Sequence, residues 1–371
     1  MQPLESFTIS RRFERVRRAI DAAAVDALLV THLPNIRYLT GFTGTAGALL
    51  VLPDRRLLLA DSRYVSAARS LTAALESGLV DVEPVDRSYD ESIAAALRRA
   101  PVSRVGIEAA HLTVARFNML SASLAETATT LVPTERIVER ARMRKDDGEV
   151  ALFREAAARL SSIARRLTEF AVAGRTEREV ADAIEEAMRR AGFSRPAFET
   201  IVASGPNSAL PHASPTDRVL QAGDPTVLDF GGVYSGYCVD LTRTVQLGGI
   251  SGDIRHLFEA VAEAQKAAIG AVRPGVRPSE DDGAPRTVLE RHGLGEAFGH
   301  GTGHGLGLEI HEDPLVGRPV AGQPDDPLEP GVVITIEPGA YVPGFGGVRI
   351  EDDVLVTADG CEVLTNVPTF L

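Results

Sequence analysis

Two strand-like segments of this chain hold carboxylates inside otherwise apolar sequence, and this pattern limits the possible folds more than any other. The first segment contains Asp229 and Asp240, with apolar residues directly before Asp229. A hairpin turn centred on Tyr234 and Ser235 would set the two carboxylates directly opposite each other on one face. Like charges in that position destabilise a plain sheet. The pattern therefore predicts an antiparallel hairpin whose carboxylates face a counter-charge.

A second segment repeats the arrangement. Glu337 follows the apolar run 334–336, and Glu351 lies beyond a glycine-rich turn centred on Gly344. The register of such a hairpin would again set the two carboxylates opposite each other. At a separation of about 5 Å and an effective dielectric constant near 20, each pair repels by roughly 3 kcal/mol. Two divalent cations would neutralise four carboxylates, whereas Arg349 alone would not.

Histidines alternate with glycines in the segment 298–312, which contains His300, His304 and His311. His300 and His304 have the spacing of a zinc-binding helix, but the density of glycine argues against a helix. Glycine instead favours a close approach of the backbone to a neighbouring group. The run 306–310 reads as a strand, which would carry His311 away from His304. Taken alone, each of these histidines is more readily explained as a structural side chain.

The first third of the chain alternates strand-like and helical patterns. Apolar runs at 27–30, 48–52, 57–60 and 104–107 are separated by segments with helical spacing. This alternation predicts an α/β domain with a helix-flanked sheet. A charged stretch at 134–149 marks the boundary, so we expect an N-terminal domain over 1–133 and a catalytic domain over 134–371.

The remaining sequence predicts an α+β domain. A long helical pattern covers 147–173, and Thr176 with Glu179 forms a capping box for the next helix. Further helical patterns follow at 254–261 and 279–292. The helices alternate with strand-like runs, including 226–230 and 332–336, which suggests helices on one face of a curved, largely antiparallel sheet.

Composition excludes several classes of protein. The chain has 39 Lys and Arg against 51 Asp and Glu, a formal net charge of −12, and so no general attraction to nucleic acid or anionic membranes. No apolar run approaches the roughly 20 residues that span a bilayer. The first 13 residues lack the apolar core of a secretory signal, and the chain has 2 cysteines. We therefore expect a cytoplasmic protein without a disulfide framework.

The combined motifs over about 140–371 resemble those of the pita-bread metallopeptidases, the family of methionine aminopeptidases, aminopeptidase P and prolidase. Five short motifs match the metal-ligand pattern of that family in order. They are LDFGG with Asp229, GYCVDLTRT with Asp240, GHGTGHGLGLEIHE with His304, TIEPG with Glu337, and RIEDD with Glu351. The resemblance implies a pita-bread fold and two divalent ions per chain. An oxygen-rich set of this kind suits Mn²⁺ first, with Co²⁺ or Zn²⁺ as alternatives.

The first third resembles the creatinase/prolidase N-terminal domain, on the segments 36–44, 47–51 and 61–64. Methionine aminopeptidases lack this domain, so the resemblance implies an enzyme that acts on Xaa-Pro peptides. We expect an Xaa-Pro aminopeptidase, with Xaa-Pro dipeptidase (prolidase) as the alternative. An inactive pita-bread module that binds peptides is the alternative from another class. It would have lost metal ligands, as creatinase has, and none of the five is lost here.

The resemblance also implies roles for individual side chains. Glu337 would move a proton as well as bind metal, and His212 and His311 would bind substrate and stabilise the tetrahedral intermediate. His300 would lie in the substrate pocket or among the residues that support the metal ligands. Arg349 would hydrogen-bond to the ligand carboxylates. The substrate would be a peptide with proline at its second position, and the family resemblance implies a homodimer.

Overall fold

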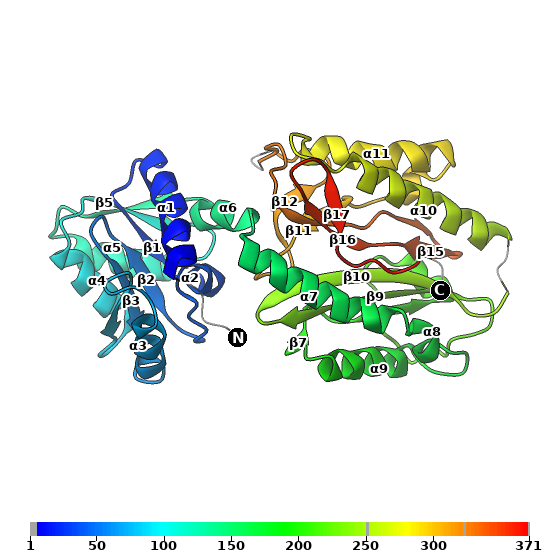
Figure 1. Ribbon diagram of the computed structural model, residues 1–371, viewed down its shortest axis with the longest axis horizontal. Coiled ribbons are helices and arrows are strands. Elements are labelled where there is room, and N and C mark those ends of the chain that lie inside the picture. Colours follow the sequence, from blue (N-terminus) through cyan, green and yellow to red (C-terminus); the bar gives the residue numbers. More distant parts are fainter. Residues whose placement is uncertain (1–5, 250–251, 322–323, 370–371) are drawn as a thin grey trace. The chain divides into compact units, whose positions relative to one another are not determined.

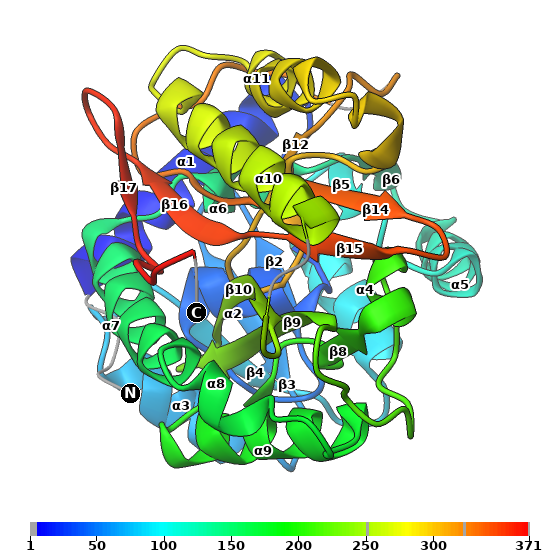
Figure 2. The same cartoon turned by 90° about the vertical axis from the view of Figure 1, so that its right-hand side faces the viewer.

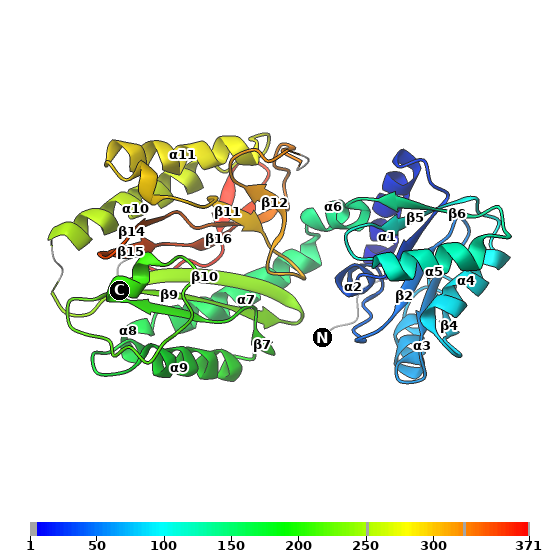
Figure 3. The same cartoon turned by 180° about the vertical axis from the view of Figure 1, so that it is seen from behind.

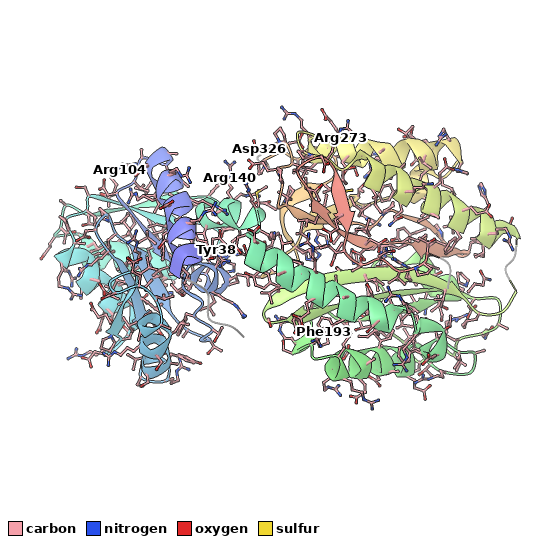
Figure 4. The ribbon with its side chains drawn as sticks, in the orientation of Figure 1. Tyr38, Arg104, Arg140, Phe193, Arg273 and Asp326 are labelled. Atoms are coloured by element: carbon pink, nitrogen blue, oxygen red, sulfur yellow. The ribbon has the colours of Figure 1, made fainter. Side chains whose placement is uncertain are left out.

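The structure is a computed structural model that describes residues 6–249, 252–321 and 324–369, and it divides into two compact units, Met1–Arg142 and Met143–Leu371 (Figure 1). This division comes after Arg142, whereas the charged stretch suggested a boundary at 133. The helix α6 (Ile137–Met143) explains the difference. Its carbonyl at Ala141 accepts a 2.9 Å hydrogen bond from the hydroxyl of Tyr38, a side chain of the first unit (Figure 4).

The first unit contains a mixed six-stranded sheet in the order β4-β3-β2-β1-β5-β6. The pairs β1–β2 and β2–β3 are antiparallel, and the pairs β3–β4, β1–β5 and β5–β6 are parallel. Helices pack beside the strands, as the alternating pattern predicts. The strands are β1 (Ala27–Val30), β2 (Ala48–Val51), β3 (Arg56–Ala60), β4 (Asp81–Pro84), β5 (Arg104–Glu108) and β6 (Thr130–Thr134), and the helices are α1 (Ser6–Ala22), α2 (Leu33–Thr40), α3 (Val65–Ala73), α4 (Tyr89–Arg99) and α5 (Val114–Leu124).

The helices of the second unit lie on two outer sides of its strands. Figures 2 and 3 show α10 and α11 on one side and α7, α8 and α9 on the other. The helices are α7 (Asp147–Ala164), α8 (Leu167–Phe170), α9 (Glu177–Arg190), α10 (Gly252–Ala271) and α11 (Pro278–Arg291). The predicted capping box of Thr176 and Glu179 is present at α9. The pattern over 147–173 is divided between α7 and α8, so the prediction of one continuous helix is wrong.

Antiparallel strands form the interior of this unit. They are β7 (Arg195–Pro196), β8 (Ile201–Ser204), β9 (Pro225–Tyr234), β10 (Tyr237–Gln246), β11 (Gly303–Gly305), β12 (Glu312–Val316), β13 (Val333–Ile336), β14 (Gly339–Val342), β15 (Gly346–Arg349), β16 (Asp352–Val356) and β17 (Cys361–Val363). Two short 3₁₀ helices, Gly205–Ala209 and Gly295–Ala297, complete the unit. Among the described helices of the chain, none is long and apolar enough to cross a bilayer.

The first hairpin has a different register from the predicted one. Asp229 pairs with Thr242, and Asp240 pairs with Gly231. The turn is centred on Ser235 and Gly236, which have φ angles of +48° and +90°. A two-residue hairpin of this type needs positive φ at both central positions, and glycine adopts it most easily. Asp229 and Asp240 therefore lie diagonally across the hairpin, and they still share one face because side chains alternate with a period of two.

The second hairpin has the predicted register. β13 pairs with β16 and β14 pairs with β15 in one continuous alignment. Glu337 and Glu351 lie at matching positions between the two paired stretches, so they are opposite each other. Gly344 in the turn has a φ of +77°, which glycine permits.

Candidate metal centre

Three of the five predicted ligands converge tightly. Asp240, His304 and Glu351 each offer one ligand atom within 4.8 Å of the others, and they come from β10, β11 and the residue before β16. All three side chains lie in the interior of the second unit. The convergence depends on tertiary structure, because the three strands are far apart in sequence.

Asp229 and Glu337 adjoin this group. The Nε2 of His304 lies 3.5 Å from the Oε1 of Glu337. The charge of Asp229 acts on Asp240, Glu337 and Glu351, which places its carboxylate next to theirs. Its Oδ2 accepts a hydrogen bond from Arg349, but its Oδ1 is buried and has no hydrogen-bond partner among the described residues. A buried carboxylate oxygen in that state is suited to a cation.

The electrostatics of the cluster also fit divalent cations. Burial, together with the neighbouring carboxylates, raises the pKa of Asp240 and of Glu351 well above the usual range. Burial raises the pKa of Glu337 to about 8, against the opposing effect of Arg349. Burial, with a further contribution from His311, lowers the pKa of His304 to about 4, so its imidazole is neutral and able to ligate. These raised pKa values favour the protonated forms of Asp240, Glu337 and Glu351, and a bound cation would replace those protons.

Hydrogen bonds from neighbouring residues orient the candidate ligands. Thr242 donates to the Oε2 of Glu351 at 2.6 Å, and Thr335 donates to the Oε1 of Glu337 at 3.3 Å. The fully buried Arg243 donates to the backbone oxygen of Glu351 at 2.5 Å. These supporting residues were not predicted from the sequence. The two threonines could be found by their spacing. Thr242 lies two positions after Asp240 and pairs with Asp229 across the hairpin, and Thr335 lies two positions before Glu337.

The glycines beside His304 allow a close approach, as predicted. A methyl group on Gly303 would overlap the backbone oxygen of Thr335, and one on Gly305 would overlap the backbone oxygen of Asp313. Both glycines belong to β11, which pairs with β13 through Gly305 and Ile334. Any larger residue at either position would displace the imidazole from the cluster.

His311 lies beside His304, which contradicts the prediction that a strand separates them. The two ring centroids are 4.4 Å apart at an angle of 67°. The segment 306–311 is not a strand, because Gly307 donates to the carbonyl of Glu309 and turns the chain. Burial lowers the pKa of His311, and the charges of His212 and Asp229 also act on it. His212 is an exposed residue of the loop before β9.

His300 and Arg349 are joined through Tyr341. The Nε2 of His300 is 3.0 Å from the hydroxyl of Tyr341, and Arg349 Nη1 lies 2.7 Å from the same hydroxyl. Burial lowers the pKa of His300 to about 4. Tyr341 was not identified from the sequence, although it lies four residues after Glu337 on the same side of the alternating strand pattern. The predicted contact between Arg349 and a ligand carboxylate is present at Asp229.

Comparisons with known proteins identify the family of both units. Residues 151–358 match Metallopeptidase family M24, and residues 12–144 match the Creatinase/Prolidase N-terminal domain. The structure of an Xaa-Pro dipeptidase from Bacillus anthracis is 36% identical, with a TM-score of 0.91 over 98% of this chain and 100% of that one. An X-Pro aminopeptidase from Thermotoga maritima is 34% identical, with a TM-score of 0.85 over 97% of this chain and 98% of that one.

A relative named Xaa-Pro dipeptidase, from Pyrococcus horikoshii, is 33% identical over 361 residues, which cover 96% of this chain and 97% of the relative. These similarities extend over both units and confirm the predicted pita-bread fold with its creatinase-type N-terminal domain. The chain therefore belongs to metallopeptidase family M24, as a metal-dependent hydrolase that carries a Creatinase/Prolidase N-terminal domain.

Proposed function

We propose that this enzyme is a prolidase, which hydrolyses Xaa-Pro dipeptides. The observation that carries the proposal is the buried cluster of Asp240, His304 and Glu351, within a chain that is similar along its whole length to Xaa-Pro dipeptidases. From the sequence we expect an Xaa-Pro aminopeptidase first and a prolidase second. The names of the relatives favour the second of these readings.

Five side chains hold two divalent cations in this proposal: Asp229, Asp240, His304, Glu337 and Glu351. The four carboxylates and one neutral imidazole match the preference of Mn²⁺, with Co²⁺ or Zn²⁺ as possible replacements. When bound, two such cations lower the pKa of water and polarise a carbonyl group. The unpartnered Oδ1 of Asp229 and the raised carboxylate pKa values support this assignment.

The other residues act on the substrate. Glu337 accepts a proton from the attacking water and returns one to the departing nitrogen. The proline nitrogen carries no N–H in the peptide, so it must gain a proton as the bond breaks. In this proposal His212 and His311 bind the scissile carbonyl group and stabilise the tetrahedral intermediate. His300 and Arg349 both hydrogen-bond to Tyr341, and Arg349 also hydrogen-bonds to Asp229. In this proposal these bonds hold Tyr341 and Asp229 in fixed positions.

Xaa-Pro aminopeptidase activity is the second candidate function. The similarity to the Thermotoga maritima X-Pro aminopeptidase favours it, because that structure matches this chain nearly as well as the dipeptidase does. Turnover of an Xaa-Pro dipeptide and an Xaa-Pro-Yaa tripeptide, each with added Mn²⁺, separates the two. A prolidase cleaves the dipeptide and leaves the tripeptide intact, whereas comparable cleavage of the tripeptide would establish the aminopeptidase.

The alternative from another class, an inactive peptide-binding module, has no support from the match to metallopeptidase family M24. It predicts no turnover of either peptide under any metal condition. The same assay with Asp240→Asn tests the metal assignment, since we expect that variant to lose at least one bound ion and its activity. Full metal content and full turnover in Asp240→Asn would refute the assignment of Asp240.

We also propose that the enzyme is a cytoplasmic homodimer. Two free cysteines, Cys238 and Cys361, support a reducing compartment. The family resemblance alone supports the dimer. Sedimentation at micromolar concentration tests it, and a mass near the 39.5 kDa of one chain would refute it.

A further inference from the structure

A second group of metal-binding side chains converges in the first unit. His32 follows β1, His111 follows β5, and Glu139 belongs to α6. One ligand atom from each lies within 4.8 Å of the others. In the part of the chain that the structure describes, this is one of two groups with that geometry, and the other is the candidate centre described above.

The two imidazoles are stacked face to face. Their ring centroids are 3.6 Å apart and their planes are inclined by 5°. Aromatic rings left to themselves prefer offset or edge-to-face arrangements, so the surrounding structure must hold this stack. The Nε2 of His111 lies 3.4 Å from the Oε1 of Glu139. A tetrahedral zinc site places its ligand atoms about 3.3 Å apart, so this pair already has the required separation.

Hydrogen bonds to Glu108 fix both histidines by their backbones. The carboxylate of Glu108 accepts from the backbone N–H of His32 at 2.8 Å, and the backbone oxygen of Glu108 accepts from the N–H of His111 at 3.0 Å. Glu108 is itself buried. One residue at the end of β5 therefore sets the positions of both imidazoles.

The carboxylate of Glu139 is held in the same way. The amide nitrogen of Asn35 donates to Glu139 at 2.6 Å and to Glu108 at 2.7 Å, and Arg142 donates to the amide oxygen of Asn35 at 2.7 Å. Asn35 and Arg142 are both buried. This layer behind the three side chains resembles the hydrogen-bonded support that orients ligands in metal sites.

We propose that His32, His111 and Glu139 form a separate site for one zinc-class divalent cation in the first unit. Two imidazoles and one carboxylate are a common zinc set, and imidazole selects such ions over Mg²⁺ or Ca²⁺. The side chain of His111 is 30% exposed, so solvent has access for entry of the ion and for a fourth ligand. A bound ion lies in the plane of each imidazole that ligates it, so at least one of the two parallel rings must rotate out of the stack when both bind the same ion. The bound ion would link the segments after β1 and β5 to α6.

Zinc titration of the full-length protein tests the proposal. The background is the triple variant Asp240→Asn/His304→Ala/Glu351→Gln, which changes all three converging side chains of the other cluster and is expected to abolish zinc binding there. We expect calorimetry and metal analysis to find one zinc ion in this background. His111→Ala and Glu139→Gln, each added to it, should weaken binding beyond the roughly 10–100-fold that loss of a supporting residue causes.

His292→Ala provides the matched control. His292 and His256 form another surface pair, with ring centroids 5.4 Å apart and tilted by 53°, and His292 lies 2.8 Å from Glu263. Zinc binding should be unchanged in this variant. A second readout is the zinc-dependent rise in melting temperature, which should disappear in His111→Ala and Glu139→Gln.

Two results would refute the site. One is a background variant that binds no zinc, which would leave His111 and Glu139 as an ordinary ion pair. The other is zinc binding that His111→Ala and Glu139→Gln leave unchanged. Neither result bears on the peptidase reaction, because the titration does not measure turnover.

Discussion

Arg349 Nη2 donates a 2.5 Å hydrogen bond to Asp229 Oδ2, and both side chains lie in the interior of the second unit. The same guanidinium donates from Nη1 to the hydroxyl of Tyr341 and to the carbonyl of Pro211, the residue before His212. One side chain thus connects a candidate metal ligand with two parts of the proposed substrate site. The planar fork of arginine makes these contacts at fixed angles.

We expect Arg349→Lys to lower turnover by about 10–100-fold, because lysine keeps the charge but cannot reach the same set of acceptors. Steady-state kinetics with Mn²⁺ and metal analysis of the purified variant measure the effect. Arg318→Lys, a change at an exposed arginine, is the control. Unchanged turnover in Arg349→Lys would contradict the positioning role.

Metal content should distinguish the variants of His304, His212 and His311. We expect His304→Ala to lose metal and activity, since it removes a proposed ligand. His212→Ala and His311→Ala should retain both ions and lose about 10²–10³ in turnover, as expected when a group that stabilises the intermediate is removed. Metal analysis and turnover are measured on each variant. Metal loss in His311→Ala with retention in His304→Ala would show that the two roles are exchanged, which their 4.4 Å ring separation makes a sharp test.

Glu177 holds the loop that carries His212. Its fully buried carboxylate accepts hydrogen bonds from the backbone N–H of Ser204 at 2.7 Å and of Thr216 at 3.0 Å, on either side of that histidine. Glu177→Gln would turn an amide N–H₂ toward these donors and leave one of them without an acceptor. We expect a loss of about 1–3 kcal/mol in unfolding free energy, together with reduced turnover.

Denaturant unfolding and steady-state kinetics test the role of Glu177. Asp182→Asn is a suitable control, because Asp182 is an exposed carboxylate on the same helix. If Glu177→Gln matched the control in both measurements, the loop would not depend on Glu177.

Asp281 gives a prediction for pH. Its carboxylate is fully buried and has no hydrogen-bond partner among the described residues. Burial and the charge of Asp282 raise the pKa of Asp281 from 3.8 to about 7, against the opposing charge of Arg273, which lies just beyond α10 (Figure 4). The folded protein thus binds this proton more tightly than the unfolded chain does. As the pH rises from about 4 to about 7, Asp281 therefore destabilises the folded protein progressively more. Above pH 7 this destabilisation is complete.

Asp281→Asn should remove the destabilisation that ionised Asp281 causes. We expect its stabilisation relative to the parent protein to grow by about 2 kcal/mol between pH 5.5 and pH 8. Denaturant unfolding at the two pH values measures the change, with Glu259→Gln, at an exposed site on α10, as the control. A difference that did not vary with pH would show that Asp281 is ionised throughout.

Patterns that act over a few residues could be predicted from the sequence. The capping box at Thr176, the apolar strands of the first unit and the register around Gly344 each depend on neighbouring residues, and the structure contains all three. The carboxylates inside apolar runs identified the catalytic unit for the same reason. Burial of a charge is visible in sequence when its neighbours are apolar, and the need for a counter-charge follows from electrostatics.

The register of the first hairpin, by contrast, depended on the choice of turn. Ser235 and Gly236 adopt positive φ, which moves Asp229 from opposite Asp240 to opposite Thr242. Two adjacent turn positions were available in the sequence, and only the one centred on Ser235 and Gly236 places a glycine in the central pair, where positive φ is needed. The side chains still share a face, so the site remained predictable although the register was wrong.

Only the tertiary structure decided which distant residues meet. A turn at Gly307 brings His311 to His304, and Arg349 reaches Asp229 across 120 positions of sequence. The group of His32, His111 and Glu139 has no sequence signal, because its members lie on separate elements of one sheet-and-helix unit. Local sequence sets the conformation of each element. Packing of apolar faces sets the approach of one element to another, and contacts between distant side chains follow from that packing.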